Sequence, residues 1–161
     1  MPVPPAFHDL VDRLDHPVLV VTAAADGERS GCLVGFHTEC SMDPPRYLVC
    51  ISQGNHTFAV AARSTHLAVH VLDRADAFLA RLFGGRTGDD VDKFAACDWQ
   101  DHHGVPVLGG AAAWFVGRVH ERIPLGDHVG HLLEPVDAEV AGGLEPMAYG
   151  QVRTMSPGHP T

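Results

Sequence analysis

A short polar segment near the middle of the chain carries side chains that could bind an anion. Its members precede an apolar stretch, residues 58–62, that predicts a helix, and they are Ser52, Asn55, His56 and Thr57. The first backbone amides of a helix have no intrahelical acceptor, so this segment predicts a site for a phosphate group. The alternative is that Asn55 or Thr57 only caps the helix, and a cap and an anion site can coexist.

A Gly126-Asp127-His128 sequence is a second candidate for chemistry. Asp127 could orient the imidazole of His128, or both residues could simply be part of a turn without a functional role. The chain has 12 histidines, which raises the question of a metal. They are dispersed, no HExxH occurs, and no cysteine–histidine cluster has zinc-finger spacing, so no dedicated metal site is predicted.

Residues 31–45 form a third candidate, between two predicted strands. Thr38 and Ser41 offer hydroxyl groups, and Gly31 and Gly35 allow a ligand to approach the backbone closely. Two consecutive prolines predict a rigid loop over residues 41–45. The alternative is that this segment is only strand and turn.

Short apolar strands and a few helices must position these groups. Apolar residues at helical spacing predict an amphipathic helix that starts near Phe7 and ends before Pro17. Strands are predicted at residues 18–22, 31–35, 47–52, 67–72, 111–119 and 129–136, and further helices at 58–62 and 74–83. Pro135 suggests an edge position for the last strand. The pattern predicts a mainly β barrel with peripheral helices, because neither G-x-G-x-x-G nor a P-loop supports a nucleotide-binding α/β sheet.

The bulk composition indicates one globular domain over residues 1–161, with a core of about residues 7–150 and a loose C-terminal tail. The formal net charge of −9, without a basic run, argues against nucleic acid or an anionic membrane surface as a partner. Four cysteines without a CxxC pair, no signal peptide and no apolar run near 18 residues predict a cytoplasmic protein with reduced thiols.

The order of several short motifs resembles the flavin reductase-like, FMN-binding split-barrel family. The motifs are residues 31–45 followed by the strand 47–52, the segment 52–57, residues 67–72, Leu82-Phe-Gly-Gly-Arg86, Asp92-Lys93-Phe94, residues 107–108 with Ala113-Trp114, and Gly126-Asp127-His128. Each motif is weak alone, but together they follow the family order from about Phe7 to about Tyr149. The resemblance implies a Greek-key-like split β-barrel that works as a homodimer and holds flavin near the dimer interface.

The resemblance also implies an NAD(P)H:flavin oxidoreductase, which transfers hydride from NADH or NADPH to FMN or FAD. Such a protein could supply reduced flavin by diffusion to a partner monooxygenase. A flavin-binding electron carrier or sensor without NAD(P)H turnover is the alternative, and a barrel that binds haem or another flat ligand is a third. The choices between FMN and FAD, and between NADH and NADPH, stay open at this point.

Site roles follow from the resemblance position by position. His128 is the catalytic candidate, expected to position and polarise the nicotinamide. Arg86 and Lys93 either bind a phosphate or pair with the aspartates around them. The residues expected to bind cofactor are Leu33, Val34, Gly35, Phe36, His37, Thr38, Ser41, Cys50, Ser52, Asn55, His56, Thr57, Arg86, Lys93, Phe94 and Tyr149.

The chain departs from the family pattern at several of these positions. Leu33 and Gly35 stand where the family usually has Thr or Ser, and His37 stands where it often has an aromatic residue. Tyr149 lacks the neighbouring His or Arg often seen there. With fewer hydroxyls, phosphate binding is expected to depend on backbone amides, Thr38 or residues 52–57.

Overall fold

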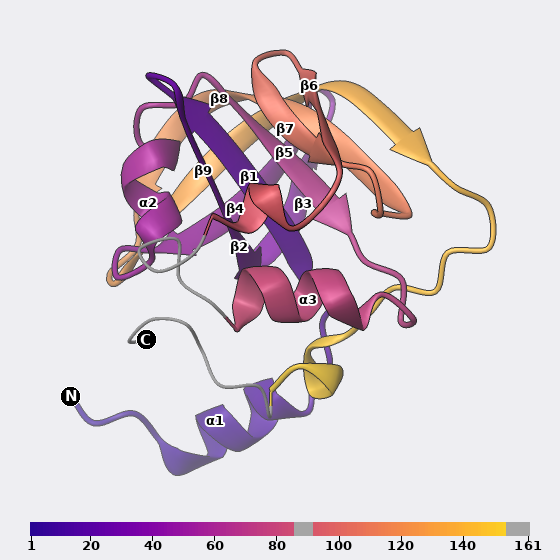
Figure 1. Cartoon of the computed structure of the whole chain (residues 1–161). Helices are drawn as coiled ribbons and strands as arrows, with labels where there is room; N and C mark the ends of the chain where they lie inside the picture. The colour runs from indigo at the N-terminus through magenta and orange to yellow at the C-terminus, as the bar shows by residue number, and fades with distance from the viewer. Residues whose placement is uncertain (86–91, 154–161) are drawn as a thin grey trace.

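The computed structural model describes residues 1–85 and 92–153, and it is mainly β with few helices, as predicted (Figure 1). Its elements are α1 (Pro5–Asp12), β1 (Leu19–Ala25), β2 (Glu28–Val34), β3 (His37–Met42), β4 (Pro45–Ser52), α2 (His56–Ala61), β5 (His66–Val71), α3 (Ala77–Gly84), the 3-10 turn η1 (Lys93–Ala95), β6 (Trp99–His102), β7 (Val105–Leu108), β8 (Ala113–Pro124), β9 (His128–Val140) and the 3-10 turn η2 (Tyr149–Gln151).

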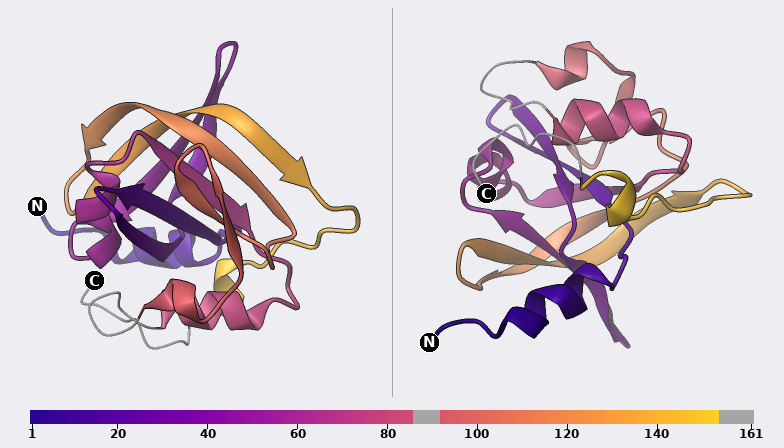
Figure 2. Two further views of the ribbon diagram at one scale, coloured as in Figure 1. Left: turned by 45° about the horizontal axis from the view of Figure 1, so that its top comes forward. Right: turned by 90° about the horizontal axis from the view of Figure 1, so that it is seen from below.

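One seven-stranded antiparallel sheet, in the order β2-β1-β5-β8-β9-β4-β3, dominates the fold. Its two edge strands, β2 and β3, are consecutive in the chain and are joined only by Gly35 and Phe36. The three residue steps from Val34 to His37 span at most about 11 Å. The sheet must therefore curl until its two edges lie near each other, and Figure 2 shows this strong curvature. A hydrogen bond from the Cys50 amide to the Phe36 carbonyl, 2.9 Å long, ties the connection to β4.

Strand β1 is buried on both faces, which explains its continuous apolar run. Leu19, Val21 and Ala23 pack in the core that the curved sheet encloses. Val18, just before the strand, and Val20 pack on the other side, in a cluster that includes α3. Both cores thus hold β1 and, through it, the adjoining edge strand β2.

A separate hairpin of β6 and β7 covers part of the sheet and was not predicted from the sequence. Its anchor is His70 of β5, which is fully buried. The His70 Nδ1–H donates to the Val20 carbonyl (2.9 Å), and Nε2 accepts from the Leu108 amide (3.0 Å). Burial lowers the pKa of His70 to about 4, so the ring is neutral near pH 7, as this pair of bonds requires.

Two local predictions need correction. The loop predicted over residues 41–45 is only a turn at residues 43–44, because β3 extends to Met42 and β4 begins at Pro45. Strand β3 is an edge strand with mostly exposed side chains, so it lacks the apolar alternation that marks a strand. Strand β9 is also not at an edge, because it lies between β8 and β4. Pro135 is accommodated because β4 pairs only as far as Leu133, while the ladder to β8 shifts register beside Gly117.

Helix α1 forms where the apolar spacing predicts it, but it buries none of its residues. Phe7 and Leu10 are 54% and 57% exposed. Figures 1 and 2 show α1 lying beside the curved sheet rather than packed within it. Among residues 1–85 and 92–153, no helix is long and apolar enough to cross a membrane, and no group of three or more His, Cys, Asp or Glu side chains could hold a metal ion.

Candidate functional site

A cavity of about 750 Å³ opens at the seam where the two edges of the sheet meet. Its walls come from the end of β2, the Gly35–Phe36 connection, the end of β4, the end of α3, the start of β9 and the segment around η2. The lining residues are Val18, Cys32, Leu33, Val34, Gly35, Phe36, Cys50, Ile51, Ser52, Asn55, Phe83, Gly84, Asp127, His128, Tyr149, Val152 and Arg153. Most of this wall is apolar, as expected for a site that holds a flat organic ligand.

The free edge of β2 adds backbone groups to this wall. The Gly31 carbonyl accepts a hydrogen bond from Lys93 Nζ (3.1 Å), so it points away from β1. Hydrogen-bonding directions alternate along an antiparallel strand, so the amide and carbonyl of Leu33 lie on the same free edge. Leu33 lines the cavity. A ligand in the cavity therefore meets one backbone donor and one backbone acceptor at this residue.

His128 lies at the start of β9, on the wall of the cavity. Its Nδ1–H donates to Oδ1 of Asp127 at 2.7 Å. This hydrogen bond is the main reason why the pKa of Asp127 lies below its usual value. The Phe36 ring packs against the imidazole, with the two ring centroids 4.9 Å apart. Within the described residues Nε2 has no hydrogen-bond partner, so it is available to a ligand.

Two thiols line the same cavity, and both are neutral near pH 7. Burial raises the pKa of Cys32 to about 11 and also raises the pKa of the half-buried Cys50. Neither is therefore an activated nucleophile. They act as small apolar side chains in the wall of the cavity.

A second cavity, of about 290 Å³, is lined in part by Gly31 and His56, the chain neighbours of Cys32 and Asn55 in the first. It contains Lys93, whose residue is only 5% exposed. Lys93 Nζ donates to the carbonyls of Gly31 (3.1 Å) and Phe83 (3.2 Å), and burial lowers its pKa. Within the described residues it contacts no carboxylate. Asp92, the nearest in sequence, instead accepts a hydrogen bond from the Phe94 amide (3.1 Å). The buried ammonium thus keeps capacity for an anion.

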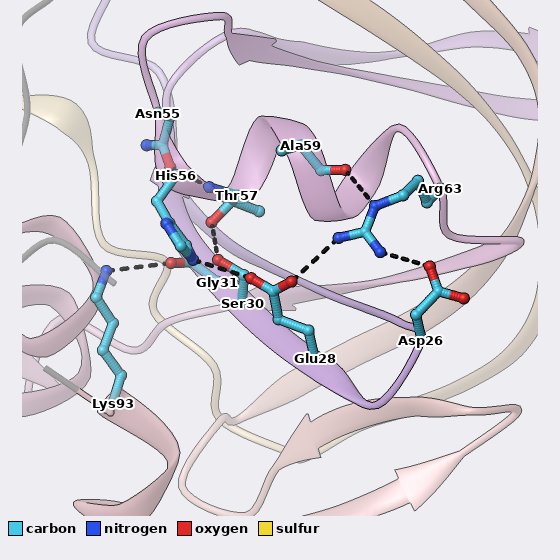
Figure 3. A network of polar contacts seen from close by, with 10 residues as sticks. All are labelled: Asp26, Glu28, Ser30, Gly31, Asn55, His56, Thr57, Ala59, Arg63 and Lys93. Carbon is cyan, nitrogen blue, oxygen red and sulfur yellow. Dashed lines mark hydrogen bonds and ion pairs between the residues drawn. The ribbon is translucent and has the colours of Figure 1, made fainter. Parts of the chain in front are cut away.

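A polar network surrounds this second cavity, as Figure 3 shows. Glu28 contacts His56 (3.4 Å) and Arg63 (3.1 Å). The Ser30 and Thr57 hydroxyls share a hydrogen bond of 2.8 Å. Asn55 Oδ1 accepts from the Thr57 amide at 2.9 Å, so Asn55 caps α2. Because α2 has only six residues and its first amides are partly used by this cap, its N-terminus adds little to anion binding.

The structure brings most of the predicted site residues together. The main cavity collects Leu33, Val34, Gly35, Phe36, Cys50, Ser52, Asn55, His128 and Tyr149. The second cavity collects His56, Lys93 and Phe94. Four predicted residues line neither cavity, and they are His37, Thr38, Ser41 and Thr57. Arg86 lies outside the described residues.

His37 has a different partner from the one expected of a cofactor-binding side chain. Its Nε2–H donates to the Pro17 carbonyl, and its Nδ1 accepts from the Tyr47 hydroxyl, both at 2.6 Å. Partial burial lowers its pKa. Next to Pro17, the His16 carbonyl accepts from the Tyr149 amide at 2.7 Å. His37 therefore helps to fix residues 16–17, to which the backbone of Tyr149 is bonded.

Sequence reasoning missed several residues of the cavity wall. They are Val18, Cys32, Ile51, Phe83, Gly84, Val152 and Arg153. Arg153 follows Tyr149 by four residues, and this spacing is the one signal that could have found it. Cys32 and Ile51 lie on strands β2 and β4, and Phe83 and Gly84 lie at the end of α3. Val18 and Val152 come to the wall on two paired segments, since the Val18 amide donates to the Met147 carbonyl at 2.9 Å.

Comparisons with known proteins identify the family of this chain. Residues 11–156 match the family described as "Flavin reductase like domain". The reductase subunit of stachydrine N-demethylase from Rhizobium meliloti (strain 1021) is 30% identical over 153 residues, which cover 92% of this chain but only 64% of that subunit. An FMN reductase (NADH) from Bradyrhizobium diazoefficiens is 32% identical over 126 residues, covering 78% of this chain and 69% of that protein.

Solved structures show the same fold. The Streptomyces globisporus NADH:FAD oxidoreductase superposes with a TM-score of 0.79 at 27% identity, and the match covers 92% of this chain and 91% of that one. The family model spans residues 11–156, and the fold match covers 92% of this chain. The chain therefore belongs to the flavin reductase-like family.

Proposed function

We propose that this protein is an NAD(P)H-dependent flavin reductase, which transfers hydride from a nicotinamide to FMN or FAD. The observation that carries the proposal is the 750 Å³ seam cavity with the Asp127–His128 pair on its wall. The family match and the FMN reductase (NADH) among the relatives support it. When bound, flavin would supply the redox chemistry, accepting hydride from the nicotinamide and passing electrons onward.

The residues of the seam cavity fit the isoalloxazine ring. The apolar walls suit a flat ring, and the volume lies in the range of small-molecule sites, about 300–1,000 Å³. The pyrimidine edge of the ring needs both donors and acceptors, and Leu33 offers one of each from its backbone. A backbone contact of this kind does not depend on the hydroxyl side chains that Leu33 and Gly35 replace.

The second cavity fits the phosphate. It adjoins the first, because Gly31 and His56 line it while their chain neighbours Cys32 and Asn55 line the main cavity. Lys93 supplies the positive charge, held in place by two carbonyls. Desolvation of the ammonium strengthens its attraction for a phosphate oxygen.

His128 fits a role in binding the nicotinamide. Its Nδ1–H is held by Asp127, so Nε2 is the ring nitrogen left to accept a hydrogen bond from a ligand. The carboxamide N–H of a nicotinamide is a suitable donor. Hydride transfer needs reacting atoms about 3–3.5 Å apart, so holding the ring in place is the main contribution expected of His128.

The same family assignment supports our proposals for the assembly and the cellular setting of the protein. The curled sheet, whose edges are joined by two residues, fits the split-barrel description. The exposed apolar face of α1 supports a homodimer, since Phe7 and Leu10 stay uncovered in the single chain. Reduced flavin could diffuse to a partner monooxygenase, and one relative is itself named the reductase subunit of a demethylase. The four free cysteines support a cytoplasmic setting.

The direct test is to mix the purified protein with FMN or FAD and NADH without oxygen and to follow flavin absorbance. Rapid bleaching at catalytic protein concentrations is expected, and NADPH in a parallel cell ranks the two donors. Flavin binding without bleaching by either donor would instead assign an electron carrier or sensor. Failure to bind flavin would overturn the proposal.

A further inference from the structure

Two parts of the seam cavity wall come from segments far apart in sequence, and they meet at Gly35. One part is the Gly35–Phe36 connection between β2 and β3, and the other is η2 with Tyr149. A Cβ added at Gly35 would lie 3.9 Å from Cδ2 of Tyr149, so the aromatic ring lies directly beside the backbone of the connection. A change in the position of η2 therefore changes the width of the cavity at this point.

The position of η2 depends on residues 15–18, the segment between α1 and β1. Figures 1 and 2 show η2 beside the end of α1. The contacts between the two segments are Gly150 N–H to Asp15 Oδ1 (2.8 Å), Tyr149 N–H to the His16 carbonyl (2.7 Å), a β-bridge between Pro17 and Ala148, and Val18 N–H to the Met147 carbonyl (2.9 Å). Residues 15–17 are exposed, as are Tyr149 and Gly150. Hydrogen bonds rather than apolar burial must therefore hold this part of the two segments.

The side chain of His37 attaches residues 15–17 to the sheet. Its Nε2–H donates to the Pro17 carbonyl at 2.6 Å. Because a carbonyl can only accept, the proton is on Nε2, and Nδ1 accepts from the Tyr47 hydroxyl at 2.6 Å. The Tyr47 ring in turn packs edge-on against Phe115, with centroids 5.2 Å apart. Among residues 1–85 and 92–153, no other side chain of the sheet is hydrogen-bonded to residues 15–17.

His37 is also the chain neighbour of the first part of the wall. It follows Phe36, whose carbonyl accepts a hydrogen bond from the Cys50 amide at 2.9 Å. One imidazole therefore links the Gly35–Phe36 connection, through its own backbone, to η2, through residues 16–17. A phenylalanine at position 37 could fill a similar space, but it could make neither of the two hydrogen bonds.

We propose that His37 is a positioning residue of the flavin site, which sets the separation between the Gly35–Phe36 connection and Tyr149. This separation determines how well the cavity holds the flat ring of a flavin. His37 lines neither cavity, so it acts through Tyr149 and not by contact with a ligand. It should therefore affect the affinity for flavin more than the rate of hydride transfer to bound flavin. The inference rests on the proposed function, because it takes flavin as the ligand of the seam cavity.

The test compares the full chain with its His37→Phe and His37→Gln variants by FMN titration and steady-state kinetics. His37→Phe loses both hydrogen bonds and should raise the Kd for FMN about threefold to tenfold. Its kcat at saturating FMN and NADH should stay within about twofold. His37→Gln keeps an N–H that can reach the Pro17 carbonyl and should recover most of the affinity. His120→Phe, at an exposed position of β8, is the matched control and should change neither quantity.

Hydrogen–deuterium exchange of the ligand-free protein checks the connection to η2 without any flavin. The amides of Tyr149 and Gly150, which are bonded to residues 15–16, should exchange faster in His37→Phe than in the parent or in His37→Gln. The Leu108 amide, which is bonded to the buried His70, should exchange at the parent's rate and so report that the sheet is intact.

Three results would each overturn the role of His37. They are an unchanged Kd for FMN in His37→Phe, equal losses of affinity in the two variants, and a loss of affinity without faster exchange at Tyr149. Bleaching of FMN by NADH would in those cases leave the reductase assignment standing. If the unaltered protein binds FMN that NADH and NADPH do not bleach, the reductase assignment fails while the Kd comparison still decides the role of His37. If it binds no FMN, both fail.

Discussion

The imidazole of His128 and the carboxylate of Asp127 are adjacent in sequence and joined by a hydrogen bond of 2.7 Å. Both residues border the seam cavity, but the Asp127 side chain is largely exposed, whereas the His128 side chain is mostly covered. The carboxylate therefore orients the ring from the solvent side, and the ring faces a site built by other segments. This arrangement separates a positioning residue from the group that would touch the nicotinamide.

Replacing His128 with alanine is expected to slow flavin reduction while leaving flavin binding nearly intact. We expect kcat/KM for NADH to fall about tenfold or more, because the hydrogen bond that orients the nicotinamide is lost. The Kd for flavin should stay within about twofold. Asp127→Asn should give a smaller loss, since the ring remains but its tautomer is no longer set by a carboxylate. Stopped-flow reduction and flavin titration measure the two quantities, and loss of flavin binding in His128→Ala would contradict the assigned role.

Gly31 allows the close contact between β2 and α3 at the seam. A Cβ added there would lie 2.7 Å from Cε1 of the buried Phe83. Gly31→Ala must displace Phe83, which lines the seam cavity, so we expect a loss of about 1–3 kcal/mol in the free energy of unfolding and weaker flavin binding. Gly142→Ala is the matched control, because a Cβ there meets nothing within 4 Å. Urea unfolding at one pH compares the two, and equal stability of both variants would contradict the packing argument.

The thiols report whether flavin occupies the seam cavity. Cys50 lines the cavity and Cys40 is exposed on β3. Since burial raises the pKa of Cys50, iodoacetamide should modify it slowly at pH 8, and saturating FMN should slow the reaction further. Cys40 should react quickly with or without FMN, and so serves as the internal control. Peptide mass spectrometry over time gives both rates; unchanged labelling of Cys50 with flavin would place the ligand elsewhere.

His70 makes stability depend on pH below neutrality. Its folded pKa of about 4 lies below the unfolded value of 6.5, so its contribution is fully present above pH 6.5 and is lost as the pH falls toward 4. His70 alone should lower the free energy of unfolding by about 3 kcal/mol between pH 7 and pH 4. His70→Gln should be less stable at pH 7 but should lose less on acidification. His8→Gln, on the exposed helix α1, is the control and should show the same pH dependence of the free energy of unfolding as the parent. If His70→Gln also kept the parent's pH dependence, groups other than His70 would be its cause.

The apolar face of α1 should hold the homodimer together. Leu10→Glu places a charge on this uncovered face, next to Phe7, and should shift the molar mass in solution from twice 17.2 kDa to 17.2 kDa. His8→Glu adds the same charge on a different side of the helix and should leave the dimer intact. Light scattering after size exclusion measures the mass. A dimer that survives Leu10→Glu would assign the interface to another surface.

Much of the framework was accessible from the sequence because it depends on local patterns. The apolar run of β1, the strand before Ser52 and the helical spacing around Phe7 each identify an element by side-chain periodicity alone. The ordered motifs, from residues 31–45 to Gly126-Asp127-His128, indicated the family and most of the residues that line the seam cavity. The Asp127–His128 pair was also accessible, since both partners are neighbours in the chain.

Edge strands, and the hairpin that covers part of the sheet, were harder to predict from the sequence, because their side-chain patterns are weak. Strand β3 has mostly exposed side chains, so nothing in its composition distinguishes it from a loop. The β6–β7 hairpin is short, and its place is set by bonds to His70 and to other residues far away in sequence.

Sequence patterns alone therefore identified the apolar core strands, the family and the chemical groups available. Tertiary structure decided how they are used. Closure of the sheet brings β2 and β4 to one seam, and the surrounding carbonyls hold Lys93 away from the aspartates beside it in sequence. The tertiary structure also places His37 where its ring bonds to the Pro17 carbonyl, and it adds Arg153 to the cavity wall. These outcomes depend on contacts between segments far apart in the chain, and such contacts exist only once the sheet has curled and its hydrogen bonds have been satisfied.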